Sequence, residues 1–167
     1  MPSRRPTITN VYINSNNKIS GTNNDATYYI DWGSILKNNT PYKLHFTYMG
    51  GVNTFALAMT DKIALIHTDL QTTSNFIHSS RGASTTQIIG YLKIQQIQPS
   101  INQAYLTAED NTNVPMYLAQ RPMNNTFTIQ IKDNQATPSF YTDSSGNSVP
   151  ANYVMVLSFT ENIMDDD

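Results

Sequence analysis

Few residues in this chain have the type and spacing that chemistry requires. The histidines are His45, His67 and His78. His67 and Asp69 fall two residues apart in an expected strand over 62–70, so both belong to one side of its pleat and a metal or acid–base pair is geometrically possible there. A working metal site would need further His and Glu residues nearby, and the sequence offers no such group. We expect His67 to be a hydrogen-bonded structural residue, and we assign no catalytic, cofactor-binding or metal-binding residue.

Other reactive arrangements are equally weak. Glu109 and Asp110 are adjacent in an expected turn, whereas glycoside chemistry needs two acids facing one cleft. The acidic run at 165–167 is typical of a solvated tail. The sequence has no Gly-x-Ser-x-Gly, phosphate-binding loop or dinucleotide motif. It has no cysteine, which excludes disulfides, thiolate zinc sites and a Cys nucleophile. The sequence therefore predicts a protein that is not an enzyme and uses no cofactor.

Composition limits the partners as well. The net charge is −2 and only 13% of residues are charged, about half the usual share. Arg4 and Arg5 form the one basic cluster, so we expect no direct nucleic-acid binding. No apolar run approaches the ~20 residues of a membrane span, and the first residues lack the apolar segment of a signal peptide. A neutral, hydrogen-bonding surface suits contact with neighbouring proteins.

The elements that must position these residues read as strands. Residues 42–49, 125–132 and 153–160 alternate between apolar and polar side chains, the period of a half-buried strand. Other short apolar runs, separated by turn residues, bring the total to eight or nine strands without a long helix. This pattern predicts an all-β fold, an antiparallel β-sandwich forming a single jelly roll of about eight strands. We expect one domain over 1–167, with a short arm at 1–6 and an acidic tail at 162–167.

Glycines and aromatic residues refine this prediction. Gly50 and Gly51 are expected to end the strand that begins at 42, and Gly21 offers a positive φ for a turn. A strand over 26–32 is expected to carry Trp32. Eight aromatic residues fall on positions that the alternation assigns to the core: Tyr28, Trp32, Tyr42, Phe46, Tyr48, Phe127, Tyr153 and Phe159.

Two long polar loops, 71–86 and 133–151, contain the remaining candidate contacts. Each includes an adjacent pair of apolar residues, and exposed apolar pairs often mark contact surfaces. The alternative is that these loops fold back over the ends of the sandwich. The candidate subunit-contact residues are Phe76, Ile77, Arg81, Phe140 and Tyr141.

Four stretches of the chain together resemble a known group of proteins. They are 42–49 (YKLHFTYM), 89–92 (IGYL), 117–129 (YLAQRPMNNTFTI) and 152–159 (NYVMVLSF). With the Asn-rich loops between them, they look like the small single jelly-roll capsid proteins of large double-stranded DNA viruses, including nucleocytoplasmic large DNA viruses and their virophage and polinton-like relatives. The resemblance covers most of the chain from about residue 26 onward.

This resemblance implies a structural virion protein. In such families a lone jelly roll commonly forms the pentamer at each fivefold vertex, the penton, whereas the major capsid protein carries two jelly rolls. The expected partners are therefore further copies of this chain, as a homopentamer, and a double jelly-roll major capsid protein. The expected location is the virion capsid, assembled in the host cytoplasm.

Three alternatives stay open at this point. The first is a minor or cement capsid protein placed between capsomers, although the penton is the role that the resemblance favours. A carbohydrate-binding jelly-roll module would use loop aromatics such as Phe140 and Tyr141 as a stacking platform. An enzyme would rely on His67 and Asp69.

Overall fold

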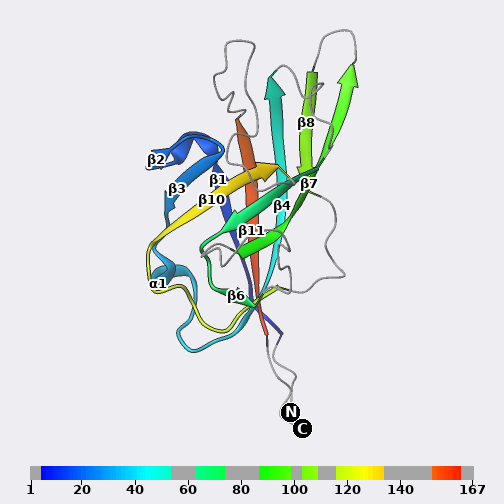
Figure 1. The fold of residues 1–167 in the computed structure, drawn as a ribbon. Coiled ribbons are helices and arrows are strands. Elements are labelled where there is room, and N and C mark those ends of the chain that lie inside the picture. The colour runs from blue at the N-terminus through cyan, green and yellow to red at the C-terminus, as the bar shows by residue number, and fades with distance from the viewer. Residues whose placement is uncertain are drawn as a thin grey trace.

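The computed structural model describes residues 5–53, 63–73, 87–98, 103–108, 116–133 and 152–162. These residues form antiparallel strands with very little helix, and hydrogen-bonded neighbours run in the order β1-β11-β4-β8-β7-β5-β10-β3-β2. The ladder folds over into two facing layers (Figure 1). The predicted all-β antiparallel sandwich is therefore confirmed.

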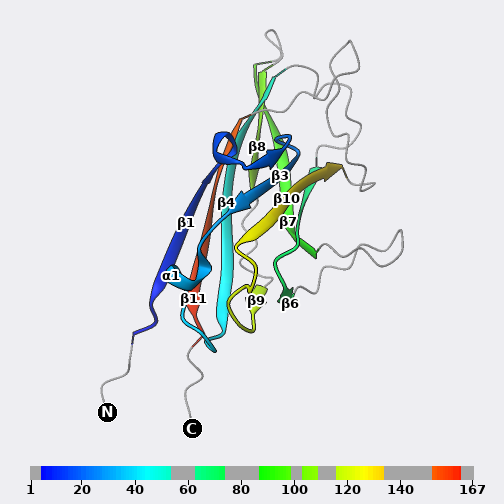
Figure 2. The ribbon, with the colours of Figure 1, turned by 90° about the vertical axis from the view of Figure 1, so that its left-hand side faces the viewer.

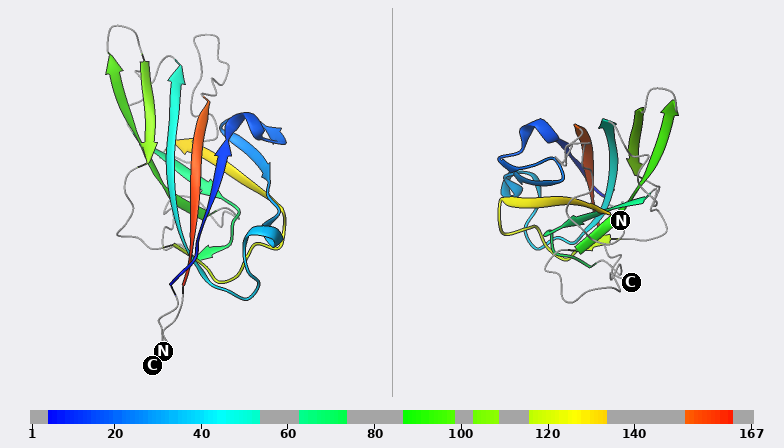
Figure 3. Two further views of the ribbon diagram at one scale, coloured as in Figure 1. Left: turned by 180° about the vertical axis from the view of Figure 1, so that it is seen from behind. Right: turned by 45° about the horizontal axis from the view of Figure 1, so that its top comes forward.

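The first layer holds four strands that lie side by side. Figure 3, in its left panel, shows them in front of β10, in the order β8, β4, β11 and β1. Their bounds are β1 Ile8–Asn14, β4 Tyr42–Asn53, β8 Gln103–Ala108 and β11 Tyr153–Glu161.

The second layer crosses behind the first, and Figure 2 shows the two layers from the side. It is connected to the first layer through β7, whose first half pairs with β5 and whose second half pairs with β8. Its strands are β2 Ser20–Gly21, β3 Asp25–Tyr29, β5 Ile63–Thr68, β7 Gln87–Gln98 and β10 Thr126–Asp133.

Four short elements complete the described part of the chain. They are η1 Ser15–Asn17, α1 Trp32–Ile35, β6 Thr72–Thr73 and β9 Met116–Leu118. β9 pairs with both β4 and β6, so it joins one end of the first layer to the segment that follows β5. Eight described strands have five or more residues, which agrees with the predicted number, and β2, β6 and β9 are shorter additions.

The core lies between the layers, where alternate side chains meet. On β11 every second residue from Tyr153 to Glu161 is buried, and on β4 the same alternation buries Tyr42 to Tyr48. All eight aromatic residues predicted for the core are buried. Trp32 is fully buried and packs against Phe127 and Phe159, with ring centroids 5.5 and 5.6 Å away.

Two sequence predictions about strand ends are wrong. β4 does not end at Gly50 and Gly51, because Gly50 pairs with Tyr153 of β11 on one side and Leu106 of β8 on the other. Hydrogen-bonded neighbours on both sides hold this glycine in the sheet. Trp32 is not on a strand, since β3 ends at Tyr29 and Trp32 begins α1.

Gly21 has the positive φ, +86°, that the sequence predicts. A β-carbon at this position would lie 2.0 Å from the backbone oxygen of Asp25, so the tight turn into β3 admits only glycine. Within the described ranges, no helix is long and apolar enough to cross a membrane.

Candidate functional site

The outer face of the first layer is the most distinctive surface of the described chain. Val11 and Ile13 of β1 point toward the core, so the pleat places Ile8 and Tyr12 on the opposite face. On β4 the same alternation places Met49 outside. These three large apolar side chains keep 61, 63 and 62% of their surface exposed.

The strand register arranges this face in rows. Tyr12 lies opposite Val156, which lies opposite Thr47; in the next row Val154 lies opposite Met49. Val154 and Val156 are half-buried because β11 has a strand on each side. Tyr12, Val156, Val154 and Met49 therefore form a continuous apolar patch across β1, β11 and β4, which we call the outer patch.

The rows beyond the outer patch are polar but almost uncharged. Asn10, Ser158 and His45 form one row, and Ile8, Thr160 and Lys43 the next. With histidine neutral, Lys43 is the one charged side chain among the outward positions of β1, β4 and β11. A neighbouring protein that covered this face would displace few bound charges from water, which keeps the cost of contact low.

A buried tyrosine cluster supports the sheet beneath the outer patch. The hydroxyls of Tyr28 and Tyr153 are hydrogen-bonded at 2.7 Å, and the rings of Tyr48 and Tyr153 stack with centroids 5.1 Å apart. The backbone N–H of Tyr153 donates to Ser15 Oγ at 3.0 Å, which fixes the end of β1 against β11. Gly50 leaves the space that these rings occupy, since a β-carbon there would lie 2.8 Å from the Tyr48 hydroxyl and from Tyr153 Cβ.

Burial changes the acidity of this cluster. Removal from water raises the pKa of Tyr153, and its hydrogen bond with Tyr28 raises it further. Burial also raises the pKa of Tyr28, an effect that its hydrogen bond with Tyr153 partly offsets. Both phenols are therefore neutral hydrogen-bonding groups of the core.

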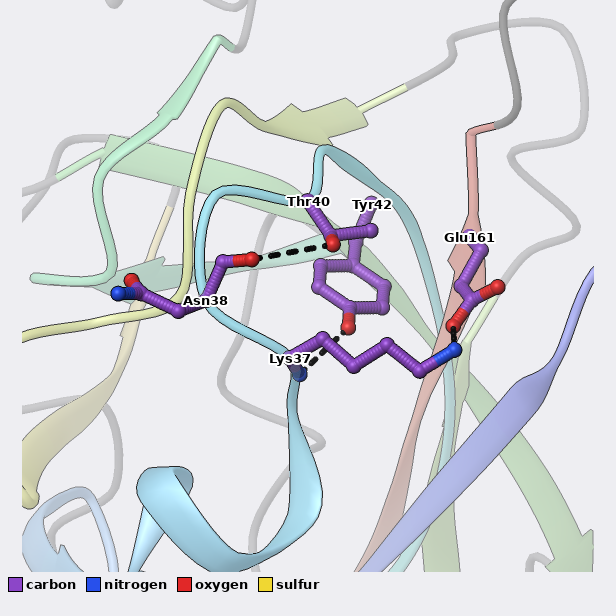
Figure 4. A network of polar contacts seen from close by, with 5 residues as sticks. All are labelled: Lys37, Asn38, Thr40, Tyr42 and Glu161. Atoms are coloured by element: carbon purple, nitrogen blue, oxygen red, sulfur yellow. Dashed lines mark hydrogen bonds and ion pairs between the residues drawn. The ribbon is translucent and has the colours of Figure 1, made fainter.

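The opposite end of the layer is tied together by polar contacts (Figure 4). The Lys37 ammonium pairs with the Glu161 carboxylate, whose side chain is only 5% exposed. The backbone N–H of Lys37 donates to the Tyr42 hydroxyl at 2.8 Å. The backbone N–H of Asn162 donates to the Pro41 carbonyl at 2.9 Å. Together these contacts fix the connection from α1 to β4 against the end of β11.

A pocket of about 380 Å³ opens beside the connection from β9 to β10. Its floor consists of the buried side chains of Leu70, Leu118 and Phe127. Its rim carries exposed polar side chains: Asp69, Gln71, Gln120, Asn124 and Thr126. An apolar floor with a hydrogen-bonding rim is typical of a site for a small polar molecule.

The structure places His67 and Asp69, the pair that the sequence singled out, in different surroundings. His67 is buried in the middle of the second layer, whereas Asp69 follows the end of β5, is exposed, and accepts a hydrogen bond from the Thr128 N–H at 2.8 Å. His45 lies on the exposed outer face of β4, as predicted. Within the part of the chain that the structure describes, no three His, Cys, Asp or Glu residues gather into a group that could hold a metal.

The predicted contact residues Phe76, Ile77, Arg81, Phe140 and Tyr141 lie outside the described residues, as do Glu109 and His78. The outer patch was missed by sequence reasoning. A signal was present in the alternation of the strands. Tyr12 alternates with the core residues Val11 and Ile13, and Met49 falls on the same side of its strand as Lys43 and His45. That β1, β11 and β4 are neighbours, however, is a long-range pairing that local patterns do not predict.

Comparison of the sequence with protein-family profiles and with curated proteins finds no match.

Proposed function

We propose that this chain is a structural capsid subunit, a single jelly roll that repeats around the fivefold vertex of a virion as the penton. The strand order is the observation that carries this proposal. A jelly roll is a long antiparallel hairpin rolled up, so that its first strand pairs with its eighth, the second with the seventh, the third with the sixth and the fourth with the fifth.

The pairings of the eight longer strands support that order for this chain. β1 pairs with β11, β3 with β10, β4 with β8, and β5 with β7. Rolling up the hairpin also brings further strands together: β11 pairs with β4, and β10 pairs with β5. This topology, joined to the capsid-like sequence stretches, supports a capsid jelly roll over other β-sandwiches.

The outer face supports a structural role. Its exposed apolar side chains and single lysine suit a surface that neighbours cover in an assembly. In a ring, one heterologous contact is repeated by rotation until the ring closes. The proposal gives the chain no catalytic role. Its partners are further copies of itself and a double jelly-roll major capsid protein, and its location is the virion, assembled in the host cytoplasm.

The native mass of the purified chain tests this proposal. Light scattering is expected to give, at the low end of a concentration range, a discrete species of five times the chain mass of 18.7 kDa. A monomer at every concentration, with no binding to a double jelly-roll capsid protein, would refute the proposal. A monomer that binds such a protein between its capsomers would instead favour the minor or cement role.

Carbohydrate binding is the second candidate, and the pocket beside β9 favours it. Its amide and carboxylate rim can hydrogen-bond neighbouring hydroxyls of a sugar, and its floor can contact the apolar side of the ring. A glycan array tests this function. Binding lost on Asn124→Leu would place the sugar in the pocket, and binding lost on Phe140→Ala or Tyr141→Ala would place it on the loop. Silence across the array would exclude the candidate.

A further inference from the structure

The free edge of β1 is the surface that the structure leaves most open to a partner. The described sheet order begins with β1 and ends with β2, so these two strands are its edges. β2 has only two residues and ends at Gly21, which protects that edge against further pairing. β1 has seven residues, without proline, charged side chain or bulge, so within the described part of the chain it has none of the features that usually protect an edge.

Two hydrogen bonds define which backbone groups of β1 point outward. The Glu161 N–H of β11 donates to the Thr7 carbonyl at 3.0 Å, and the Tyr153 N–H donates to Ser15 Oγ at 3.0 Å. In an antiparallel pair, residues alternate between pointing their N–H and C=O toward the partner strand and away from it. The odd-numbered residues of β1 therefore direct their backbone N–H and C=O groups toward β11.

The even-numbered residues carry the free ladder. Ile8, Asn10 and Tyr12 direct their N–H and C=O groups away from β11, and Asn14 directs its N–H the same way while its carbonyl begins η1. The first three are exposed, and the structure shows no backbone hydrogen bond on this side among the described residues. Such a row of donors and acceptors binds an extended strand by strand addition.

We propose that β1 of a second copy of this chain pairs antiparallel with this edge, about a twofold axis at Val11. In this register Ile8 lies opposite Asn14 of the partner, and Asn10 opposite Tyr12 of the partner. The outward backbone groups of the two ladders match and form up to about six hydrogen bonds, because the Asn14 carbonyl of each copy begins η1. The two four-stranded layers join into one continuous sheet.

Charge and packing favour a second copy as the partner. β1 has no charged side chain, so two copies meet without like-charge repulsion. Val11, half-buried in one copy, meets Val11 of the other and becomes covered. The outer patch continues across the axis, because Tyr12 lies at the edge that the two copies share. This contact rests on the proposed structural role and adds a twofold contact that is distinct from the ring contact.

Proline substitution at an outward position tests the contact directly. Asn10→Pro removes one outward N–H while it leaves the odd-numbered residues bonded to β11, a position that an edge strand tolerates. Asn10→Ser is the matched control, because it keeps the N–H and a small polar side chain. Analytical ultracentrifugation is expected to show that Asn10→Pro weakens the twofold association at least about tenfold, and that Asn10→Ser changes it by less than about twofold.

Amide hydrogen exchange gives an independent readout on the unaltered protein. The N–H groups of Thr9, Val11 and Ile13 are expected to be protected at every concentration. Those of Asn10 and Tyr12 are expected to gain protection only as the concentration rises. The same measurement on Asn10→Pro shows whether the odd-numbered amides, and with them the fold, are intact.

The outcomes separate this inference from the proposed function. A pentameric ring that Asn10→Pro leaves unchanged, with fast exchange at Asn10 and Tyr12, overturns the β1 contact while the ring stands. A dimer that is sensitive to Asn10→Pro, without any larger ring, supports the β1 contact and counts against the penton. A monomer at all concentrations overturns the β1 contact.

Discussion

The packing of Tyr48 against Tyr153 leaves no room for a β-carbon at Gly50 of the first layer. A β-carbon there would lie 2.8 Å from each of two tyrosine side chains, closer than atoms normally approach. Gly50→Ala is expected to lower the free energy of unfolding by about 1–3 kcal/mol, because the rings must shift within a packed core. Urea unfolding at neutral pH measures this change.

Gly33 provides the matched control. It lies in α1, and an added β-carbon would be 3.4 Å from Asp31 Oδ1 and 3.5 Å from an Arg121 nitrogen, which leaves enough room. Gly33→Ala is expected to be neutral or to stabilise the protein by up to about 1 kcal/mol, because alanine restricts the unfolded chain. Equal destabilisation by the two substitutions would contradict the proposed role of Gly50.

The hydrogen bond between Tyr28 and Tyr153 predicts a loss of stability in alkali. Burial raises the pKa of both phenols above the ordinary value of 10.0. Above pH 10 the unfolded chain loses these protons while the folded chain keeps them, so the free energy of unfolding falls as the pH rises. Each tyrosine contributes up to about 1.4 kcal/mol per pH unit above pH 10, and the loss becomes small below about pH 9.

Tyr28→Phe with Tyr153→Phe is expected to flatten this decline, as measured by urea unfolding between pH 8 and 11. Tyr153→Phe alone is expected to cost about 1–3 kcal/mol at pH 7, because it leaves the buried Tyr28 hydroxyl without this partner. The double variant should cost less than the sum of the two single variants. Additive costs and an unchanged alkaline slope would show that the pair is not coupled.

At the scale of elements, the Lys37–Glu161 pair connects the segment after α1 to the end of β11. Glu161 is nearly buried while Lys37 is 52% exposed, so water screens part of the attraction. Lys37→Met is expected to lower the free energy of unfolding by about 1 kcal/mol, because the carboxylate loses its cation. Glu161→Gln is expected to cost less, since the exposed ammonium that remains is solvated.

Lys43 is the matched control for this pair. It lies on the exposed face of β4, with no salt bridge among the described residues. Lys43→Met is expected to change the free energy of unfolding by no more than about 0.5 kcal/mol in the same urea titration. A larger cost for Lys43→Met than for Lys37→Met would contradict the assigned role of the pair.

The strands show how far local patterns predict this fold. Alternation is a local property, so it correctly places Phe127 and Phe159 in the core and strands at β4, β10 and β11. The length of β4 could not be predicted in this way. Gly50 reads locally as a break, yet its partners Leu106 and Tyr153 come from distant parts of the chain and hold it in the sheet.

For the whole molecule, the candidate site shows the same limit. The parity of Tyr12 and Met49 is readable from the sequence, but the outer patch exists only because β11 lies between β1 and β4. That order results from the closure of the sandwich, which brings the last strand beside the first. Chemical motifs gave no guide to this surface, because its function as proposed depends on shape and low charge rather than on reactive groups.

The outer patch makes a prediction about assembly that is independent of the β1 edge. Met49→Lys places a charge on the patch at a side chain that is 62% exposed. Met49 lies on β4, and β11 separates this strand from the β1 edge. The fold has room for it, so the free energy of unfolding should change by less than about 0.5 kcal/mol. Self-association should weaken at least about tenfold, because the lysine must lose water at the contact.

Ile19→Lys is the control for this substitution, since Ile19 is a similarly exposed apolar residue, at 58%, that pairs with Thr27 of the second layer. Sedimentation of the two variants beside the unaltered chain measures the effect. Loss of assembly in Met49→Lys alone would assign the contact to the outer patch. Equal loss in both variants would mean that association follows general surface hydrophobicity. In that case the outer patch would have no specific part in self-association.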